Sequence, residues 1–244
     1  MKRPGRLKPP RRRRSPRARP ATRRSLALRL GLTGGIASGK STVAERLRQH
    51  GAVLLDADQV SRDLTKPGSP VLAELAASFG AEILRPDGSL DRPRLGRIAF
   101  ADPSNLARLN SITHPPIWKE IHHRLGELSR HNPVVVLMAP LLLEHGGEGC
   151  VDQVWVVHVS PQAQLDRLVQ RDGLSEQAAR ERVQAQMAPA ERLKRADVVI
   201  DNSGPLQETL GQVDAAWRDR ILPLLRDSGT GAAHASTGAE GDTG

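Results

Sequence analysis

A glycine-rich stretch at residues 28–42 holds the side chains best suited to chemistry. It reads LRLGLTGGIASGKST, in which Gly34, Gly39, Lys40 and Ser41 follow the spacing G-x-x-x-x-G-K-[ST] of a phosphate-binding loop. Glycines allow turns that a side chain would forbid, so the loop N–H groups can point inward at phosphate oxygens. Lys40 would reach the β- and γ-phosphates, and the Ser41 hydroxyl would hold Mg²⁺. The candidate nucleotide-binding residues of the loop are Gly34, Gly35, Ala37, Ser38, Gly39, Lys40, Ser41 and Thr42.

The flanks of this stretch argue against a glycine-rich turn that binds nothing. Residues 28–33 are an apolar run that predicts a strand, and residues 43–50 have the apolar spacing of a helix. A strand before the loop and a helix after it are the context that a phosphate-binding loop requires.

A pair of carboxylates follows the second apolar run, residues 52–56 (AVLLD), which predicts a buried strand. Asp56 and Asp58 come at its carboxyl end, where open parallel sheets bind ligands. In an extended segment, residues two apart point the same way, so both carboxylates are expected near the loop. Asp58 also suits the N-cap of the helix that follows, and the two roles are compatible.

The remaining apolar runs predict the elements that position these groups. They indicate an α/β fold with a five-stranded parallel sheet flanked by helices. Pro115 and Pro116 should kink or split the longest helical stretch. The further strands are expected at residues 133–139, 154–159 and 197–200, and helices at residues 69–80, 91–100, 103–131 and 205–225, with others after residues 160 and 175.

A densely charged segment at residues 170–195 separates the fourth and fifth predicted strands. With little apolar surface and several arginines, it resembles a mobile lid over transferring phosphate. For most of these arginines a solvated helix face is the better interpretation. Arg171 is the exception, because it follows an apolar helix and precedes a turn.

Charge is distributed unevenly along the 244 residues. Of the 36 basic residues, 13 lie in residues 1–29, which leaves 23 against 27 acidic residues, a net charge of −4. The folded part therefore does not have the composition of a nucleic-acid binder. Residues 1–25 are Arg/Pro-rich and predict a disordered basic arm. The arm could contact nucleic acid or an acidic membrane surface, or be a targeting peptide, but disorder without a function or a start assigned too early is favoured. A disordered tail is predicted for residues 227–244.

The single cysteine, Cys150, is compatible with a reducing compartment, and no apolar run reaches the length of a membrane span. A cytoplasmic protein is therefore expected.

Two absences narrow the kind of phosphate-loop protein. The third predicted strand carries no acidic residue, unlike that of ATPase motors, and no Asn-Lys-x-Asp guanine-reading motif is present. A small kinase remains, in which Asp58 would activate the acceptor hydroxyl while the loop, Lys40 and Mg²⁺ neutralise phosphate charge.

The motifs GLTGGIASGKST, DAD with Arg62, HPPI, PLLLE, QRDG, AQM and ADVVIDNSG resemble the dephospho-CoA kinase family, from about residue 28 to about residue 220. The resemblance implies transfer of the γ-phosphoryl group of ATP to the ribose 3′-hydroxyl of dephospho-CoA, the last step of coenzyme A synthesis. It also implies a kinase domain at residues 26–226, with a helical CoA-binding region at about 66–131 and a lid at about 170–195.

Site roles follow from the resemblance motif by motif. Asp58 would be the catalytic base, and Arg62 would hold substrate phosphates or steady Asp58. His114 would lie in the CoA-binding region, Arg171 would be the lid arginine, and Asn202 would lie near the adenine of ATP.

The sequence departs from the family pattern in two places. Met138 stands where many members carry an acidic residue, which leaves metal binding to Ser41, with Asp56 or Asp58 helping through water. The basic arm is also outside the pattern.

Two rival functions remain open. Another small-molecule or nucleotide kinase would share the loop but not DAD and HPPI together. A nucleic-acid-associated regulator would bind through the arm, with strong salt dependence. Oligomeric state is not predicted.

Overall fold

A computed structural model of the chain describes residues 27–227. The predictions for the basic arm at residues 1–25, and for the tail beyond Asp227, lie outside the described residues. Asp227 itself, where the tail was expected to begin, is the last residue of a helix.

A five-stranded parallel sheet with the order β2-β3-β1-β4-β5 forms the centre of the fold, which confirms the predicted fold class. The apolar runs form strands because both faces of the sheet are covered by helices. β1, the central strand, is almost wholly buried and leads directly into the phosphate-binding loop. The strands are β1 (Leu28–Gly34), β2 (Val53–Asp56), β3 (Val134–Met138), β4 (Gln153–His158) and β5 (Val198–Asp201).

Helices on the two faces of the sheet enclose separate cores. On one face, α1 (Lys40–Gln49) and α9 (Leu206–Ala216) pack Val43, Leu47 and Val213 against the strands. On the other face, the C-terminal half of α5 (Pro103–His131) packs Ile121 and Leu125 against β3 and β4. Both ends of the phosphate-binding loop are therefore fixed to a packed interior.

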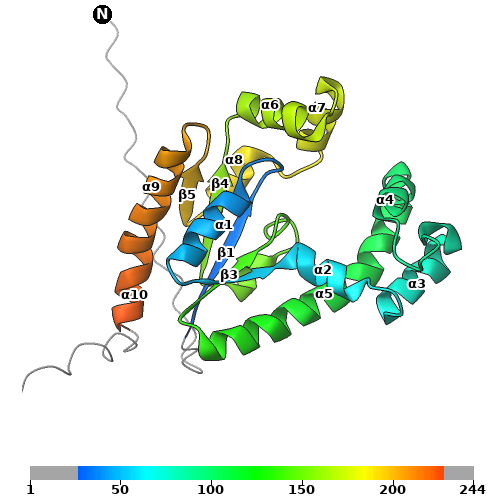
Figure 1. Ribbon diagram of the computed structural model, residues 1–244, viewed down its shortest axis with the longest axis horizontal. Coiled ribbons are helices and arrows are strands. Elements are labelled where there is room, and N and C mark those ends of the chain that lie inside the picture. The colour runs from blue at the N-terminus through cyan, green and yellow to red at the C-terminus, as the bar shows by residue number, and fades with distance from the viewer. Residues whose placement is uncertain (1–26, 228–244) are drawn as a thin grey trace, which may run out of the picture.

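A group of helices at one end of the molecule has an apolar core of its own (Figure 1). Leu72, Leu75 and Phe79 pack there with Leu95 and Ile112. The N-terminal half of α5 packs in this group and its C-terminal half packs on the main sheet, so α5 joins the two parts. The group consists of α2 (Ala57–Leu64), α3 (Pro70–Phe79), the short 3-10 turn η1 (Ala81–Ile83), α4 (Arg92–Ala101) and the N-terminal half of α5.

Pro115 and Pro116 were expected to kink or split the long helix, and they do not split it. α5 continues through both prolines over 29 residues. The prolines remove the N–H donors to two carbonyls one turn earlier, but apolar packing before and after them keeps the helix continuous, with Ile112 on one side and Ile121 on the other.

The C-terminal helix is interrupted where a single helix was expected. After α9, the π-helical turn η3 (Trp217–Ile221) inserts an extra residue before α10 (Leu222–Asp227). Trp217 and Ile221 are both buried against the sheet, so the π turn keeps two large apolar side chains on one face.

The segment predicted as a lid holds α7 and α8. α6 (Pro161–Asp172) and α7 (Glu176–Gln184) stand apart from the sheet in Figure 1, whereas α8 (Pro189–Lys194) lies against it. The short 3-10 turn η2 (Gly147–Cys150) connects β3 to β4 beside α8. Among the described residues, no helix is both long enough and apolar enough to cross a membrane.

Candidate active site

The phosphate-binding loop joins β1 to α1 in a backbone conformation that requires glycine. Gly39 has φ 89°, and Ala37 has φ 56°, the single positive φ of a non-glycine residue in the described chain. A Cβ at Gly34 would lie 2.5 Å from the Val157 carbonyl oxygen and 2.7 Å from the Ser38 Oγ. Close packing thus requires glycine at position 34, and backbone conformation requires it at position 39.

Side chains outside the loop bind three consecutive loop carbonyls, those of residues 36–38. Gln164 Nε2 donates to the Ile36 carbonyl at 2.8 Å, and Arg167 Nη1 donates to the Ala37 carbonyl at 3.3 Å. Asn202 Nδ2 donates to the Ser38 carbonyl at 2.7 Å. Carbonyls held from outside favour amides that point inward, which is how a loop of this kind surrounds an anion.

Lys40 lies across the mouth of the loop. Its Nζ donates to the Gly34 carbonyl at 2.9 Å and to the Gly35 carbonyl at 3.0 Å. Burial lowers the pKa of the ammonium from 10.5 to about 8, while attraction by Asp58 acts in the opposite direction. The lysine is therefore a desolvated cation beside a carboxylate, poised to exchange backbone carbonyls for phosphate oxygens.

Ser41 and Thr42 form the first turn of α1, with Ser41 exposed. The exposed Ser41 hydroxyl is a hard oxygen donor of the type that Mg²⁺ prefers, at the helix end that attracts phosphate. The described residues contain no cluster of three or more acidic, His or Cys side chains that could bind a metal unaided. The site therefore fits an ion that takes most of its ligands from phosphate and water.

Asp56, and not Asp58, is the N-cap of α2. Asp56 Oδ1 accepts the Asp58 N–H at 2.8 Å and the Gln59 N–H at 3.4 Å. Because the helix begins at Ala57, Asp58 lies in its first turn and not in an extended segment. The sequence-based expectations of an Asp58 cap, and of an extended segment in which both carboxylates point the same way, are both wrong.

The Asp58 carboxylate is left without a capping role and is electrostatically coupled to Lys40. Partial burial raises its pKa, and repulsion by Asp56 raises it further, whereas Arg62, Lys40 and Arg92 lower it. A carboxylate with a raised pKa is a better proton acceptor than an exposed one. A carboxylate with a raised pKa thus lies within electrostatic reach of Lys40.

Two arginines lie near Asp58 at the entrance to the helical group. Arg62, one turn along α2, lies 3.7 Å from the Asp56 carboxylate. Arg92, at the start of α4, donates to Thr65 Oγ1 at 2.5 Å, and its pKa is lowered by burial and by the nearby Arg62. Sequence reasoning missed Arg92, because no local pattern indicates that α4 folds back onto α2.

A groove runs from Arg92 into the helical group. Ser61, Thr65, Asn110 and Thr113 provide polar groups along it, and Leu75, Leu90, Leu95 and Leu109 provide an apolar wall. Elongated ligands with both polar and apolar parts suit such a lining.

His114 lies deeper in α5 and is half-buried. Its ring makes an edge contact with His145, with centroids 4.2 Å apart. Burial lowers its pKa, and so does the neighbouring His145. The two histidines connect α5 to the segment after β3.

Arg171 is exposed near the end of α6. It binds Asp172 through Nε at 2.7 Å, and its charge acts on Lys40. Asn202 is buried, and its side chain is occupied within the protein, since its Oδ1 accepts from Thr209 Oγ1 at 2.8 Å. In this conformation Asn202 supports the loop, and Arg171 lies at the surface.

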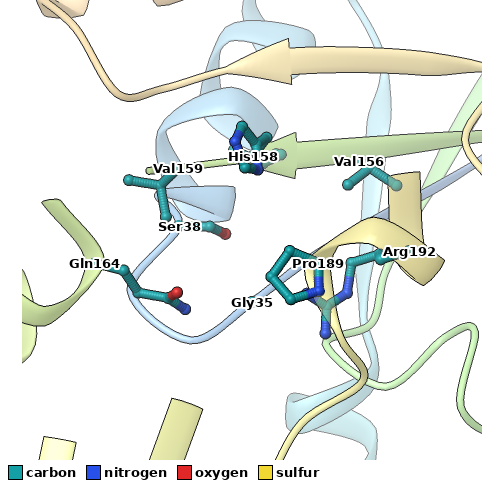
Figure 2. Close-up of a pocket in the computed structure, with 9 residues that line it drawn as sticks. Gly35, Ser38, Val156, His158, Val159, Gln164, Pro189 and Arg192 are labelled. Carbon is teal, nitrogen blue, oxygen red and sulfur yellow. The ribbon is translucent and has the colours of Figure 1, made fainter. Parts of the chain in front are cut away.

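Sequence reasoning also missed a buried ion pair beside the loop. Arg192, 5% exposed, donates to Glu144 Oε1 at 3.2 Å, and it lines a small pocket together with Gly35 and Ser38 (Figure 2). Dense charge at residues 170–195 indicated a solvated face, and no pattern signalled that Arg192 turns inward. For its partner a signal was available, because Glu144 ends the motif PLLLE.

A glycine-rich loop whose carbonyls are held from outside, a desolvated lysine and an uncommitted aspartate just after β2 provide what phosphoryl transfer requires. Together with the parallel sheet they define the class of P-loop kinases.

Comparison with known proteins identifies the family within that class. A family model described as CoaE, dephospho-CoA kinase, matches residues 28–208. A dephospho-CoA kinase of Symbiobacterium thermophilum is 49% identical over 190 residues, which cover 78% of this chain and 80% of the relative. One of Moorella thermoacetica is 48% identical over 206 residues, which cover 84% and 97%. The chain belongs to the dephospho-CoA kinase family.

Solved structures agree with this assignment. The crystal structure of TT1252 from Thermus thermophilus has 34% sequence identity and a TM-score of 0.70, and the match covers 80% of this chain and 98% of that one. Dephospho-CoA kinase from Campylobacter jejuni has 28% identity and a TM-score of 0.61, with 78% and 95% covered.

Proposed function

We propose that this protein phosphorylates the ribose 3′-hydroxyl of dephospho-CoA with ATP, which yields coenzyme A in the last step of its synthesis. The proposal is supported by membership of the family and by the site. The observation that carries it is the coupling of Lys40, inside the phosphate-binding loop, to Asp58, a carboxylate with a raised pKa at the end of the next strand.

Asp58 accepts the proton of the acceptor hydroxyl. Burial and the neighbouring Asp56 raise its pKa, which makes the carboxylate a stronger base. Because Asp56 caps α2, the backbone that carries Asp58 is fixed, and the base is held in place before substrate arrives.

The loop amides and Lys40 hold the phosphates and offset the charge that develops during transfer. Ser41 is the residue that would hold Mg²⁺, which when bound neutralises charge on the β- and γ-phosphates. Arg171 adds a further cation when the lid, residues 170–195, lies over the nucleotide. The segment around Asn202, at the end of β5, lies near the adenine.

The helical region at residues 66–131 binds dephospho-CoA. Arg62 and Arg92 contact its phosphates beside Asp58, and the groove between α2, α4 and α5 receives the rest of the molecule. His114, whose ring contacts His145 in the segment after β3, belongs to this region. The protein acts in the cytoplasm on a small molecule, and the kinase domain at residues 26–226 does not bind nucleic acid.

A panel of acceptors tests the proposal. Purified protein with ATP and Mg²⁺ is expected to consume ATP with dephospho-CoA and not with AMP, CMP, gluconate or shikimate. Turnover with one of those acceptors and none with dephospho-CoA would overturn the proposed substrate and favour another small-molecule kinase.

A further inference from the structure

The backbone of Ile36, in the middle of the phosphate-binding loop, is bound on both sides by glutamines. The Ile36 N–H donates to Gln186 Oε1 at 2.7 Å, and the Ile36 carbonyl accepts from Gln164 Nε2 at 2.8 Å. Since a backbone N–H can only donate and a carbonyl can only accept, the orientation of both side-chain amides is fixed. One glutamine acts as acceptor and the other as donor.

The two glutamines come from opposite ends of the segment that carries α7. Gln164 lies in α6, before α7, and is 5% exposed. Gln186 follows α7 and is half-buried. The segment is therefore joined to the loop at both of its ends, through a single residue.

The neighbouring glycine makes room for this arrangement. A Cβ at Gly35 would lie 2.8 Å from Gln164 Nε2 and 3.4 Å from both Gln186 Oε1 and Arg192 Nη1. Figure 2 shows Gln164 on one side of Gly35, with Pro189 and Arg192 on the other. Side chains from α6 and α8 thus converge on the same point of the loop.

We propose that Gln164 and Gln186 are positioning residues that hold the loop backbone at Ile36 from both sides. This pair of contacts, the clamp, would couple the conformation of the loop to the position of the lid. A loop with positive φ at Ala37 and Gly39 is costly to hold in this conformation, so contacts from outside help to fix it. With the clamp in place, ATP meets a loop whose backbone is already ordered at Ile36. The inference rests on the kinase activity proposed above.

Methionine substitutions test the clamp, because they keep side-chain length and remove the hydrogen bond. Gln164→Met and Gln186→Met are each expected to raise the KM for ATP by about 3- to 10-fold, the equivalent of one hydrogen bond. The KM for dephospho-CoA is expected to stay unchanged. Gln162→Met is the matched control, since Gln162 lies on the same helix but binds Asp166 at the surface. Wild-type KM values for ATP in both clamp variants would overturn the proposal.

Glutamate substitutions separate hydrogen-bond polarity from charge. Gln186→Glu still accepts from the Ile36 N–H, whereas Gln164→Glu sets a carboxylate oxygen against the Ile36 carbonyl. Both add the same negative charge beside the nucleotide. The clamp predicts that Gln164→Glu raises the KM for ATP about 10-fold more than Gln186→Glu does. Equal effects would show that charge alone is responsible and would overturn the clamp.

Two further measurements keep the outcome clear. Thermal unfolding without ligand shows whether Gln164→Met folds. If it does not fold, the KM for ATP of the Gln186 variants tests the clamp, because Gln186 is only half-buried. ADP affinity by calorimetry measures the clamp without turnover. A wild-type protein that binds ADP but does not phosphorylate dephospho-CoA would refute the proposed function alone, whereas unchanged ADP affinity in the variants would refute the clamp.

Discussion

The ammonium group of Lys40 is buried among backbone carbonyls. Its protonation should make ATP binding depend on pH. Its pKa in the free protein is lowered to about 8 by desolvation, so the ammonium is lost as pH rises through that value. A neutral lysine does not attract phosphate. The kcat/KM for ATP is therefore expected to fall as pH rises above about 8, measured by steady-state kinetics between neutral and alkaline pH.

The control for this prediction is Lys40→Arg. Arginine stays charged throughout this range, so the alkaline fall should disappear even though its fork-shaped group fits the loop less well and lowers activity. The same alkaline fall in the arginine variant would assign the titration to another group.

Asp58 is the residue whose loss should affect turnover most. Asp58→Asn keeps the shape of the side chain but removes the proton acceptor, and kcat is expected to fall about 100- to 10,000-fold. ATP should still bind, which calorimetry can check. In the wild type, kcat/KM for dephospho-CoA should decline as pH falls toward the raised pKa of Asp58, because the protonated carboxyl cannot accept a proton. Asp166→Asn, at an exposed carboxylate of α6, is the control. Near-normal turnover in Asp58→Asn would contradict the base assignment.

At the scale of single residues, the site residues that could be identified from the sequence are those that follow a short-range pattern. The loop glycines, Lys40 and Ser41 have a fixed spacing, and Asp58 follows a recognisable strand. Arg92, Arg167 and Arg192 belong to no comparable pattern, because contacts between residues far apart in the chain bring each of them to the site.

At the scale of elements, the cap of α2 determines how the base is presented. Asp56→Ala is expected to destabilise the fold by about 1 kcal/mol, whereas Asp56→Asn, which also caps well, should have little effect. Chemical unfolding monitored by circular dichroism measures both.

The same pair of variants separates capping from charge. Since Asp56 raises the pKa of Asp58, Asp56→Asn should move the acid limb of kcat/KM for dephospho-CoA to lower pH. An unmoved acid limb would show that Asp56 does not influence the base.

The Arg192–Glu144 pair fixes α8 to the segment after β3. Arg192→Met should destabilise the fold by about 3–5 kcal/mol, because it leaves Glu144 with a buried charge and no partner. The double variant with Glu144→Met should cost much less. Thermal or urea unfolding measures each.

An exposed pair on α7 provides the comparison. Arg180 and Glu176 are more than half exposed, so Arg180→Met should cost under about 0.5 kcal/mol. If Arg192→Met cost no more than Arg180→Met, the buried pair would not be what fixes α8.

Most strands and helices could be predicted from apolar spacing and turn residues, with ends that differ by a residue or two. The exceptions depend on tertiary packing. α5 continues through two prolines because it is packed on both sides of them, and the last helix contains a π turn because Trp217 and Ile221 both face the core. Local sequence carries no information about either partner surface.

On the scale of the whole molecule, α9 supports the nucleotide site by binding the end of α1 opposite the phosphate-binding loop. Asp214 on α9 binds Arg46 at 2.7 Å and His50 at 2.7 Å, both at the end of α1. The His50 ring stacks on Trp217. α1 begins at the phosphate-binding loop and ends in this network, so the helix is fixed at both ends.

The strongly basic N-terminal arm has a charge opposite to that of residues 30–244, whose net charge is −4. A kinase site built wholly within residues 27–227 should not need it. Deleting residues 1–25 is therefore expected to leave kcat and both KM values unchanged. Any affinity of the full chain for DNA should fall steeply with salt and disappear in the deletion variant, because it would come from lysine and arginine contacts to phosphate.

A variant in which the basic residues of the arm are replaced by glutamine separates charge from length. Binding to a short DNA duplex at two salt concentrations, together with kinase kinetics, compares the three chains. If both altered chains lost kinase activity, the arm would contribute to catalysis through its charge. If the deletion alone lost activity, its length or position would matter, and in either case the site within residues 27–227 would not be sufficient.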